Sequence, residues 1–294
     1  MILFVSGRCD IVAHFTPWFM NRYEEGFIDV RNPFNRHLVS RIYFEDVDAI
    51  LFCTKNPIPI VDKLETINKP IIFHVTLTPY RKDIEPGLPD KNEIIDAIKK
   101  ISDLIGPENV YLRYDPIFIS DVYTLDYHKK AINKITELLD GYVKHIIVSF
   151  IDDYKNVRKN MKYLKFRKFT SDDFKEIGKS FSEAAECHGM TVQTCFEDET
   201  LVEYGFIKGE CMSSSLAYYL TGKKFKRQKT RKDNKCECVE MVDIGVYNTC
   251  SHFCKYCYAN FDETLVSKNM KNHNPNSSLL IGELEDDDVI KRRR

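Results

Sequence analysis

The 294-residue chain lacks long apolar runs and any excess of one charge. No stretch approaches the roughly 20 consecutive apolar residues of a membrane-spanning helix. Residues 1–5 are apolar, but the run ends at Ser6-Gly7-Arg8, far short of a signal peptide. The formal net charge is −1, so no global field attracts the protein to nucleic acid or membranes. We therefore expect a cytoplasmic protein that does not enter a membrane.

The sequence also lacks internal repeats and flexible linkers, whereas cysteine is plentiful, with ten residues. Disulfides are rare in the cytosol, so another role is needed for these thiols. They are either buried apolar side chains or metal ligands. Cys9, Cys53 and Cys187 have no partner at a ligand spacing, and we interpret them as ordinary small apolar residues.

Short β-branched and aromatic runs alternate with amphipathic patterns along the chain. Strands are predicted near Ile2–Val5, Ala49–Thr54, Ile71–Thr78, Val110–Tyr114, His145–Phe150, Thr191–Thr194 and Val239–Tyr247. Helices are predicted after Asp90, around Ile132–Leu139 and after Ser171-Asp172. This alternation indicates an α/β fold with a parallel sheet, and about seven strands favour a full or partial (β/α) TIM-type barrel.

We expect one domain over residues 1–294, in three parts. Residues 1–195 supply strands and helices of the barrel, 196–238 form a basic insertion with cysteines, and 239–294 carry the last strand, a cysteine loop and the tail. Polar residues follow the predicted strands, where barrels carry function. They are Ser6, Arg8, Asp10, Thr54, Lys55, Asn56, Thr76, Thr78, Arg113, Asp115, Ser149, Asp152 and Glu197. Strand ends are also polar wherever they meet solvent, so only their recurrence favours a site.

The sharpest signal is the spacing C-x3-C-x2-C formed by Cys250, Cys254 and Cys257 after a predicted strand. Thiolates are the standard ligands of iron–sulfur clusters. Three ligands for four irons would leave one iron open for a reaction, whereas a structural site is closed. The alternative is a zinc site made of the three cysteines with His252 or His273.

This motif, with Tyr256 before the third cysteine, resembles that of the radical S-adenosylmethionine (SAM) enzymes. The resemblance implies a [4Fe–4S] cluster whose open iron binds the amino and carboxylate groups of SAM, with Tyr256 beside the adenine. An electron from the cluster would cleave a C–S bond of SAM, and the resulting 5′-deoxyadenosyl radical would remove hydrogen from a substrate. A reductant such as flavodoxin or ferredoxin would supply the electron.

In those enzymes the motif lies near the N-terminus, whereas here it lies near the C-terminus. Circular permutation is tolerated where chain ends meet, and it would make Val239–Tyr247 the first strand and Ile2–Val5 the second. In that order the chain resembles the spore photoproduct lyase-like branch, through residues 51–56, 72–78 and 83–89. This resemblance implies that Lys55, Thr76 and Thr78 lie near SAM, with Lys55 on its carboxylate. Asn56 replaces a serine of that pattern.

Over nearly its full length the chain resembles a bacterial family known as domain of unknown function 1848. The resemblance rests on Trp18–Arg22, Val30–Asn35, Thr54–Pro57, Arg113–Pro116 and Asn248–Asn260. It brings no established substrate. At a predicted strand end, Arg113 and Asp115 form either a structural ion pair or a binding site for SAM or substrate.

A second set of cysteines precedes the motif: Cys195, Cys211, Cys236 and Cys238. Four thiols are enough to saturate a closed metal site. We expect an auxiliary [4Fe–4S] cluster near the mouth of the active site; a structural zinc ion and unligated thiols are the alternatives.

Two basic stretches are candidates for nucleic-acid contact. Residues 223–235 carry eight positive charges against one negative, and residues 155–168 carry seven basic residues interleaved with aromatic ones. Charge runs are more often solvated surfaces. The sequence therefore leaves three function classes: a radical SAM enzyme acting on an unknown substrate, such as a nucleic acid or nucleotide; a non-catalytic iron–sulfur or zinc protein that binds nucleic acid; and a non-radical SAM-dependent enzyme.

Overall fold

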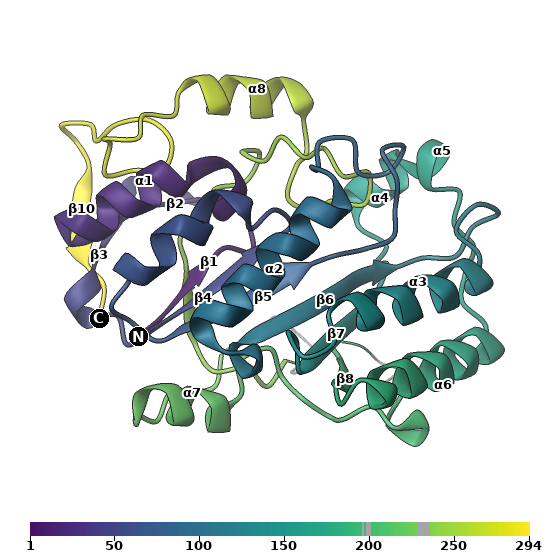
Figure 1. Cartoon of the computed structure of the whole chain (residues 1–294). Coiled ribbons are helices and arrows are strands. Elements are labelled where there is room, and N and C mark those ends of the chain that lie inside the picture. Colours follow the sequence, from purple (N-terminus) through teal and green to yellow (C-terminus); the bar gives the residue numbers. More distant parts are fainter. Residues whose placement is uncertain (196, 198–200, 229–235) are drawn as a thin grey trace.

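The structure, a computed structural model, describes residues 1–195, 197, 201–228 and 236–294. Its main sheet contains β1 (Ile2–Val5), β4 (Ala49–Thr54), β5 (Ile71–Thr76), β6 (Val110–Ile117), β7 (His145–Phe150), β8 (Thr191–Thr194) and β9 (Met241–Asp243). The order is β8-β7-β6-β5-β4-β1-β9, and all neighbouring strands are parallel (Figure 1). The predicted α/β fold with a parallel sheet is confirmed.

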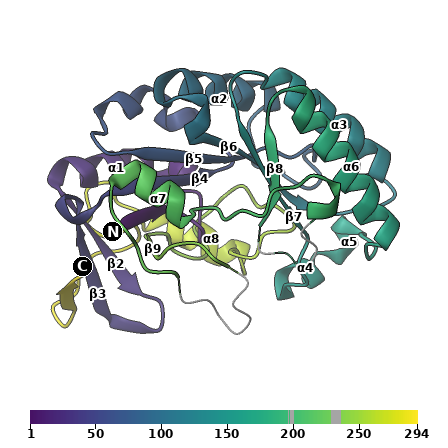
Figure 2. The same cartoon turned by 90° about the horizontal axis from the view of Figure 1, so that it is seen from below.

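One face of this sheet is covered by helices. They are α1 (Ile11–Glu25), the 3-10 helix η2 (Ile58–Thr66), α2 (Lys91–Ile105), α3 (Leu125–Leu138) and α6 (Ser171–Cys187). Figure 2 shows α2, α3 and α6 as an arc outside the strands. α2 begins where the sequence predicts, because Asp90 and Glu93 form a capping box, and it ends at Gly106. Successive neighbouring strands with right-handed crossovers place the helices on one side.

The residues of each strand alternate between the two faces of the sheet. Phe52, Phe73 and Leu112 pack toward the helices, within the main hydrophobic core. The opposite, inner face has an apolar base, where Ile2, Leu51, Ile72, Tyr111 and Ile147 contact Met212, Ala217 and Val239. Ala217 belongs to α7 (Ser214–Thr221), which covers this base. Toward the carboxyl ends of the strands, the inner positions become polar, and this change creates the candidate site.

Within the described residues the sheet is open, so of the full or partial TIM-type barrel that the sequence favours, the closed form is not observed. Across the described residues, β8 and β9 are the two edges of the sheet and do not pair. Beyond β8 the chain returns to lie beside that strand, where Gln193 and Ile207 form a parallel bridge and the Ile207 amide donates to the Val192 carbonyl at 2.8 Å. A returning segment that covers an edge removes the need for closure.

The last strand of the sheet lies beside the first, as permutation predicts. β9 pairs with β1 in the register Ile2↔Met241 to Phe4↔Asp243. β9 is shorter than the predicted Val239–Tyr247. A Cβ at Gly245 would lie 1.9 Å from Ser6 Oγ, so the chain leaves β9 pressed closely against the end of β1.

A second, smaller sheet was not predicted. It consists of β2 (Phe27–Asn32), β3 (Asn35–Tyr43) and β10 (Val289–Arg292) in the order β10-β3-β2. The remaining elements are η1 (Phe44–Asp46), η3 (Pro107–Asn109), α4 (Lys155–Lys159), α5 (Met161–Leu164), η4 (Val202–Tyr204) and α8 (Glu263–Lys271). Within the described ranges, no helix is both long enough and apolar enough to cross a bilayer. In the basic stretch 223–235, residues 229–235 lie outside the described residues, as do 196 and 198–200 of the predicted insertion.

Candidate metal centre

A cavity of about 430 Å³ lies on the inner face of the sheet, at the carboxyl ends of the strands. Both predicted sets of cysteines line this cavity, although their members are as far apart in sequence as Cys195 and Cys257. The lining thiols of the two sets are Cys195, Cys211, Cys236, Cys238, Cys250, Cys254 and Cys257. Ligand sites of open parallel sheets are generally found at this end of the strands.

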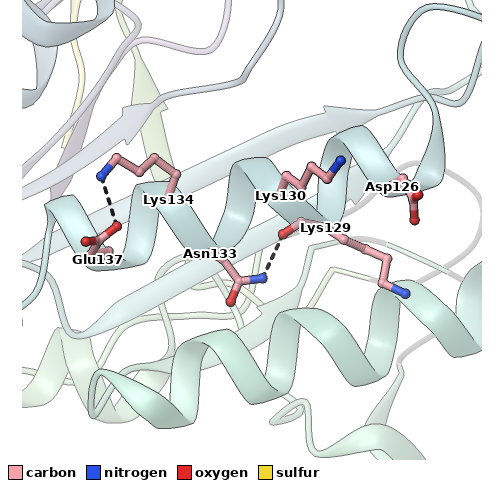
Figure 3. A pocket seen from close by; sticks show the side chains of 6 residues that line it. All are labelled: Asp126, Lys129, Lys130, Asn133, Lys134 and Glu137. Carbon is pink, nitrogen blue, oxygen red and sulfur yellow. Dashed lines mark hydrogen bonds and ion pairs between the residues drawn. The ribbon is translucent and has the colours of Figure 1, made fainter.

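A second hollow, on the outside of the molecule, has a different character. Figure 3 shows that its six lining side chains all come from α3. Lys134 is paired there with Glu137 at 2.9 Å, and both are exposed. This is a solvated helix surface, and we assign no site to it.

The three motif cysteines occupy one loop between β9 and α8, and their thiols are held away from water. Burial, with Asp10 and the other two thiols as further causes, raises the pKa of Cys250 well above its ordinary value. Burial and the nearby Glu85 likewise raise the pKa of Cys254. Buried thiolates that repel one another are stabilised by a bound cation, so the loop is suited to a metal group.

Amide side chains fix the path of this loop. Asn248 has φ +57°, and its Oδ1 accepts from the amide of Phe261 at 2.5 Å. Asn260 Nδ2 donates to the Cys250 carbonyl at 2.7 Å. From α4, Asn156 Nδ2 donates to the Asn260 carbonyl at 2.9 Å, and just before α5, Asn160 Nδ2 donates to the Lys255 carbonyl at 2.7 Å. The loop is thus organised by groups other than the thiols.

The turn at residues 83–89 packs directly on the cysteine loop. The Lys255 amide donates to the Ile84 carbonyl at 2.9 Å, and the Gly87 amide donates to the His252 carbonyl at 3.0 Å. A Cβ on Gly87 would lie 2.5 Å from the carbonyl oxygen of Ser251. A close approach of two backbones therefore requires glycine here.

This turn brings in Glu85, a buried carboxylate to which the sequence analysis assigned no role. It accepts from Thr78 at 2.8 Å, from Lys55 at 3.2 Å, and also from Tyr256 and Lys91. Burial alone would raise its pKa, but Lys55 and Lys91 lower the pKa of Glu85 to about 2. Glu85 is therefore a charged centre that holds four side chains in place.

Not all of the predicted SAM neighbours line the cavity. Tyr256, Lys55 and Thr76 line the cavity, and Lys55 Nζ lies 5.1 Å from the centre of the Tyr256 ring. Thr78 is turned toward Glu85 and is not among the lining residues. Because Glu85 already pairs with Lys55, the carboxylate of a bound ligand would share the Lys55 ammonium group with Glu85.

Two histidines lie beside the first motif thiol. His14 Nε2 is 3.5 Å from Cys250 Sγ, and His252 Nε2 is 3.0 Å from Asp10 Oδ2. His14, Cys250 and His252 offer ligand atoms that all lie within 4.8 Å of one another. Burial, together with His252, lowers the pKa of His14 to about 4. The neutral ring is the form that ligates metals.

The second set of cysteines forms a chain of thiols along another part of the cavity wall. Cys195 Sγ and Cys211 Sγ are 3.0 Å apart, much farther than the roughly 2.05 Å of a disulfide. Cys238 is hydrogen-bonded to both Cys211 and Cys236. These contacts link the four residues pairwise along one part of the cavity wall.

Arg113 and Asp115 stand beside this second set. They form an ion pair at 2.6 Å, and Arg113 Nη1 also donates to Cys211 Sγ at 3.2 Å. Burial alone would raise the pKa of Asp115, but Arg113 and then Ser149 lower it. The structural ion pair considered from the sequence is present, and it also contacts a candidate ligand.

Four further lining residues lie beside the two sets of cysteines. Asp10 caps α1 and accepts from Thr54 Oγ1 at 2.7 Å, a role that its position before a helix could have suggested. Cys53 and Cys9, interpreted as ordinary apolar residues, also line the cavity. Burial raises the pKa of both thiols to about 11, so they remain protonated. Glu197 lines the cavity as well, and burial raises its pKa to about 8.

Fold and site together define a parallel α/β protein in which two groups of cysteines face one cavity. The chain belongs to the family described as domain of unknown function (DUF1848), whose profile matches residues 2–259. The match thus includes all seven cysteines of the two sets and ends two residues after Cys257. A search of curated proteins found no match.

Proposed function

We propose that this protein is a radical SAM-type enzyme, built on a permuted partial (β/α) barrel. It would bind a [4Fe–4S] cluster through Cys250, Cys254 and Cys257, cleave SAM reductively and abstract hydrogen from a substrate. The carrying observation is that three thiols of one loop, two buried and one half-buried, face a cavity of about 430 Å³ at the carboxyl ends of a parallel sheet.

The ligand set fits an iron–sulfur cluster. All three motif ligands are thiols, which these clusters require. Among the described residues, the Sγ atoms of Cys250, Cys254 and Cys257 do not all lie within 4.8 Å of one another. A single tetrahedral ion with metal–sulfur bonds of about 2.3 Å would draw its sulfurs to roughly 3.8 Å from one another. The wider spacing supports a multinuclear cluster.

When bound, the cluster and SAM would supply the electron and the radical, while this chain's residues prepare the site. Glu85 orients Tyr256 by accepting its hydroxyl proton in a hydrogen bond, and it holds Lys55 over the same ring. Tyr256 thereby presents a fixed aromatic face for an adenine. The apolar base of the inner face and the lining residue Phe150 limit access of water.

We further propose that Cys195, Cys211, Cys236 and Cys238 hold an auxiliary [4Fe–4S] cluster. The support is their convergence from distant segments on the wall of the same cavity. Four thiolates would close this cluster to exogenous ligands. The Arg113 guanidinium beside Cys211 favours the thiolate form that ligation needs.

The test uses protein purified and reconstituted without oxygen, then given dithionite and SAM. We expect 5′-deoxyadenosine from the wild type and none from a Cys254→Ala variant. S-adenosylhomocysteine in its place would favour a non-radical SAM enzyme. A colourless protein that still holds only zinc after reconstitution would contradict the proposal.

A single metal ion at His14, Cys250 and His252 is a second candidate, because their ligand atoms already lie together. Mixed nitrogen and sulfur ligands suit zinc. This alternative expects one zinc per chain that is lost in His14→Ala but kept in Cys257→Ala. The cluster proposal instead expects iron to be lost in Cys257→Ala and kept in His14→Ala.

A further inference from the structure

The segment from α4 to residue 168 is strongly basic, and its basic side chains do not line the cavity. Its exposed cations are Lys155, Arg158, Lys159, Lys162, Lys165, Arg167 and Lys168, with no acidic residue among 155–168. Arg158 and Arg167 pair with Asp153 and Asp173. The five lysines form no ion pair with a carboxylate of the described residues. We call residues 155–168 the basic face.

The inner side of the basic face packs on the cysteine loop. Val157 and Leu164 share a hydrophobic cluster with Cys254 and Tyr256. Asn156 Nδ2 also donates to the carbonyls of Cys257 and Tyr258, at 3.4 and 3.2 Å. Only this thin layer therefore separates the solvent-facing lysines from two motif cysteines.

The cysteine loop contributes a cation and an aromatic contact to the same surface. Tyr163 is 48% exposed, and its ring centre lies 4.8 Å from Lys162 Nζ and 5.1 Å from Lys255 Nζ. Lys255 lies between the second and third motif cysteines. Exposed aromatic rings are enriched at protein interfaces, whose rims are polar.

We propose that the basic face is the docking surface for an acidic one-electron carrier protein of the flavodoxin or ferredoxin kind. This inference rests on the proposed function, which needs an external electron. A negatively charged carrier would be steered to the unpaired lysines and would then lie against the loop of the motif cysteines.

Nucleic acid is the other polyanion that such a face would attract, but the cavity disfavours it as the partner. Among the described residues that line the cavity, the basic ones are Lys55 and Arg113, and both are paired internally. The lining also contains the carboxylates of Asp10, Asp115 and Asp152. A nucleic acid delivered to this cavity would meet negative charge, whereas an electron carrier need not enter it.

The test compares two triple variants that each remove three charges. K155Q/K159Q/K162Q alters the basic face, and K129Q/K130Q/K134Q alters the α3 surface of Figure 3. Flavodoxin is the probe. Its binding is measured by calorimetry, and reduction of the cluster by reduced flavodoxin is followed by stopped-flow absorbance at low and high salt.

We expect the basic-face variant to lower the association rate and the rate of reduction about tenfold at low salt. The deficit should shrink at high salt, because salt screens exposed charges. The α3 variant and reduction by dithionite should match the wild type. Equal behaviour of the two triple variants would overturn the proposal.

Two further outcomes are decisive. In one outcome, the wild type binds single-stranded DNA but not flavodoxin, and the basic-face variant no longer binds the DNA. The basic face would then be a nucleic-acid-binding surface, and the carrier proposal would be wrong. If the chain holds no cluster, the proposed function falls, while the binding titration, which needs no cluster, still decides whether the face selects the carrier.

Discussion

The two groups of cysteines that face the cavity are assembled in different ways. Cys250, Cys254 and Cys257 lie within a single loop, and amide groups of Asn156 and Asn260 hold its backbone. The second group comes from positions 195, 211, 236 and 238, and its thiols contact one another directly. A loop fixed by its own hydrogen bonds is suited to bind a metal group and leave one position open. A group assembled from separate segments is suited to a closed site, in which the metal also joins the segments.

The largest expected effect follows from removing a motif ligand. Cys254→Ala should reduce formation of 5′-deoxyadenosine to background, because the open cluster loses one of only three protein ligands. The matched control is Cys187→Ala, at an exposed thiol outside both groups. The assay is chromatography of the nucleoside product. Formation of 5′-deoxyadenosine by Cys254→Ala would show that SAM cleavage does not need the first group of cysteines.

Removing a ligand of the second group should lower the iron content of the protein, while the first group keeps its cluster. After reconstitution, the wild type should hold about eight irons per chain and Cys238→Ala about four. Iron analysis and electron paramagnetic resonance measure this difference. About four irons in both proteins would show that the second group binds no cluster.

Glu85 ties the first group to the fold, so its loss should act on that group selectively. Glu85→Gln leaves the ammonium groups of Lys55 and Lys91 without their buried counter-charge. We expect the free energy of unfolding to fall by about 3 kcal/mol. Urea titration measures the loss, and Glu137→Gln, at an exposed pair on α3, is the control. Equal stability of the two variants would contradict the role of Glu85.

The pH dependence of stability provides a second test of Glu85. Its pKa is about 2 in the folded protein, against an ordinary value of 4.5. A lowered pKa stabilises the folded state above the ordinary value, and this contribution is lost as the pH falls from about 4.5 toward 2. Unfolding followed over this range should show the loss in the wild type and a smaller one in Glu85→Gln.

The smallest effect is expected at the contact between the turn and the loop. Gly87→Ala places a Cβ against Ser251 and His252, so the loop must shift, at a cost of about 1–3 kcal/mol. The rate of iron loss to a chelator should rise for the first group only. Gly141→Ala is the control, since its Cβ would meet nothing within 4 Å, although its φ of +79° adds backbone strain. Similar iron loss in both variants would contradict a specific contact.

Much of the sheet could be predicted because its signals are local. The strand Ile2–Val5 and the α2 start after Asp90 follow from β-branched runs and capping chemistry. The hairpin of β2 and β3 was missed because Arg and Asn interrupt its alternation, and its partner β10 lies some 250 residues away. β9 is shorter than predicted and ends at Asp243, and beyond it Gly245 lies close to Ser6, which is some 240 residues away in sequence.

The sequence by itself determined the parallel α/β fold, the neighbouring positions of the first and last strands of the sheet, and the loop of three cysteines. The fold and the cysteine loop depend on periodicity and spacing within short segments, whereas the neighbouring positions of the two strands were expected from a family resemblance. Only the tertiary structure decided that the sheet of the described residues stays open and that Glu85 holds Lys55, Thr78, Lys91 and Tyr256. The physical reason is that burial and charge pairing are set by residues distant in sequence, which no local pattern contains.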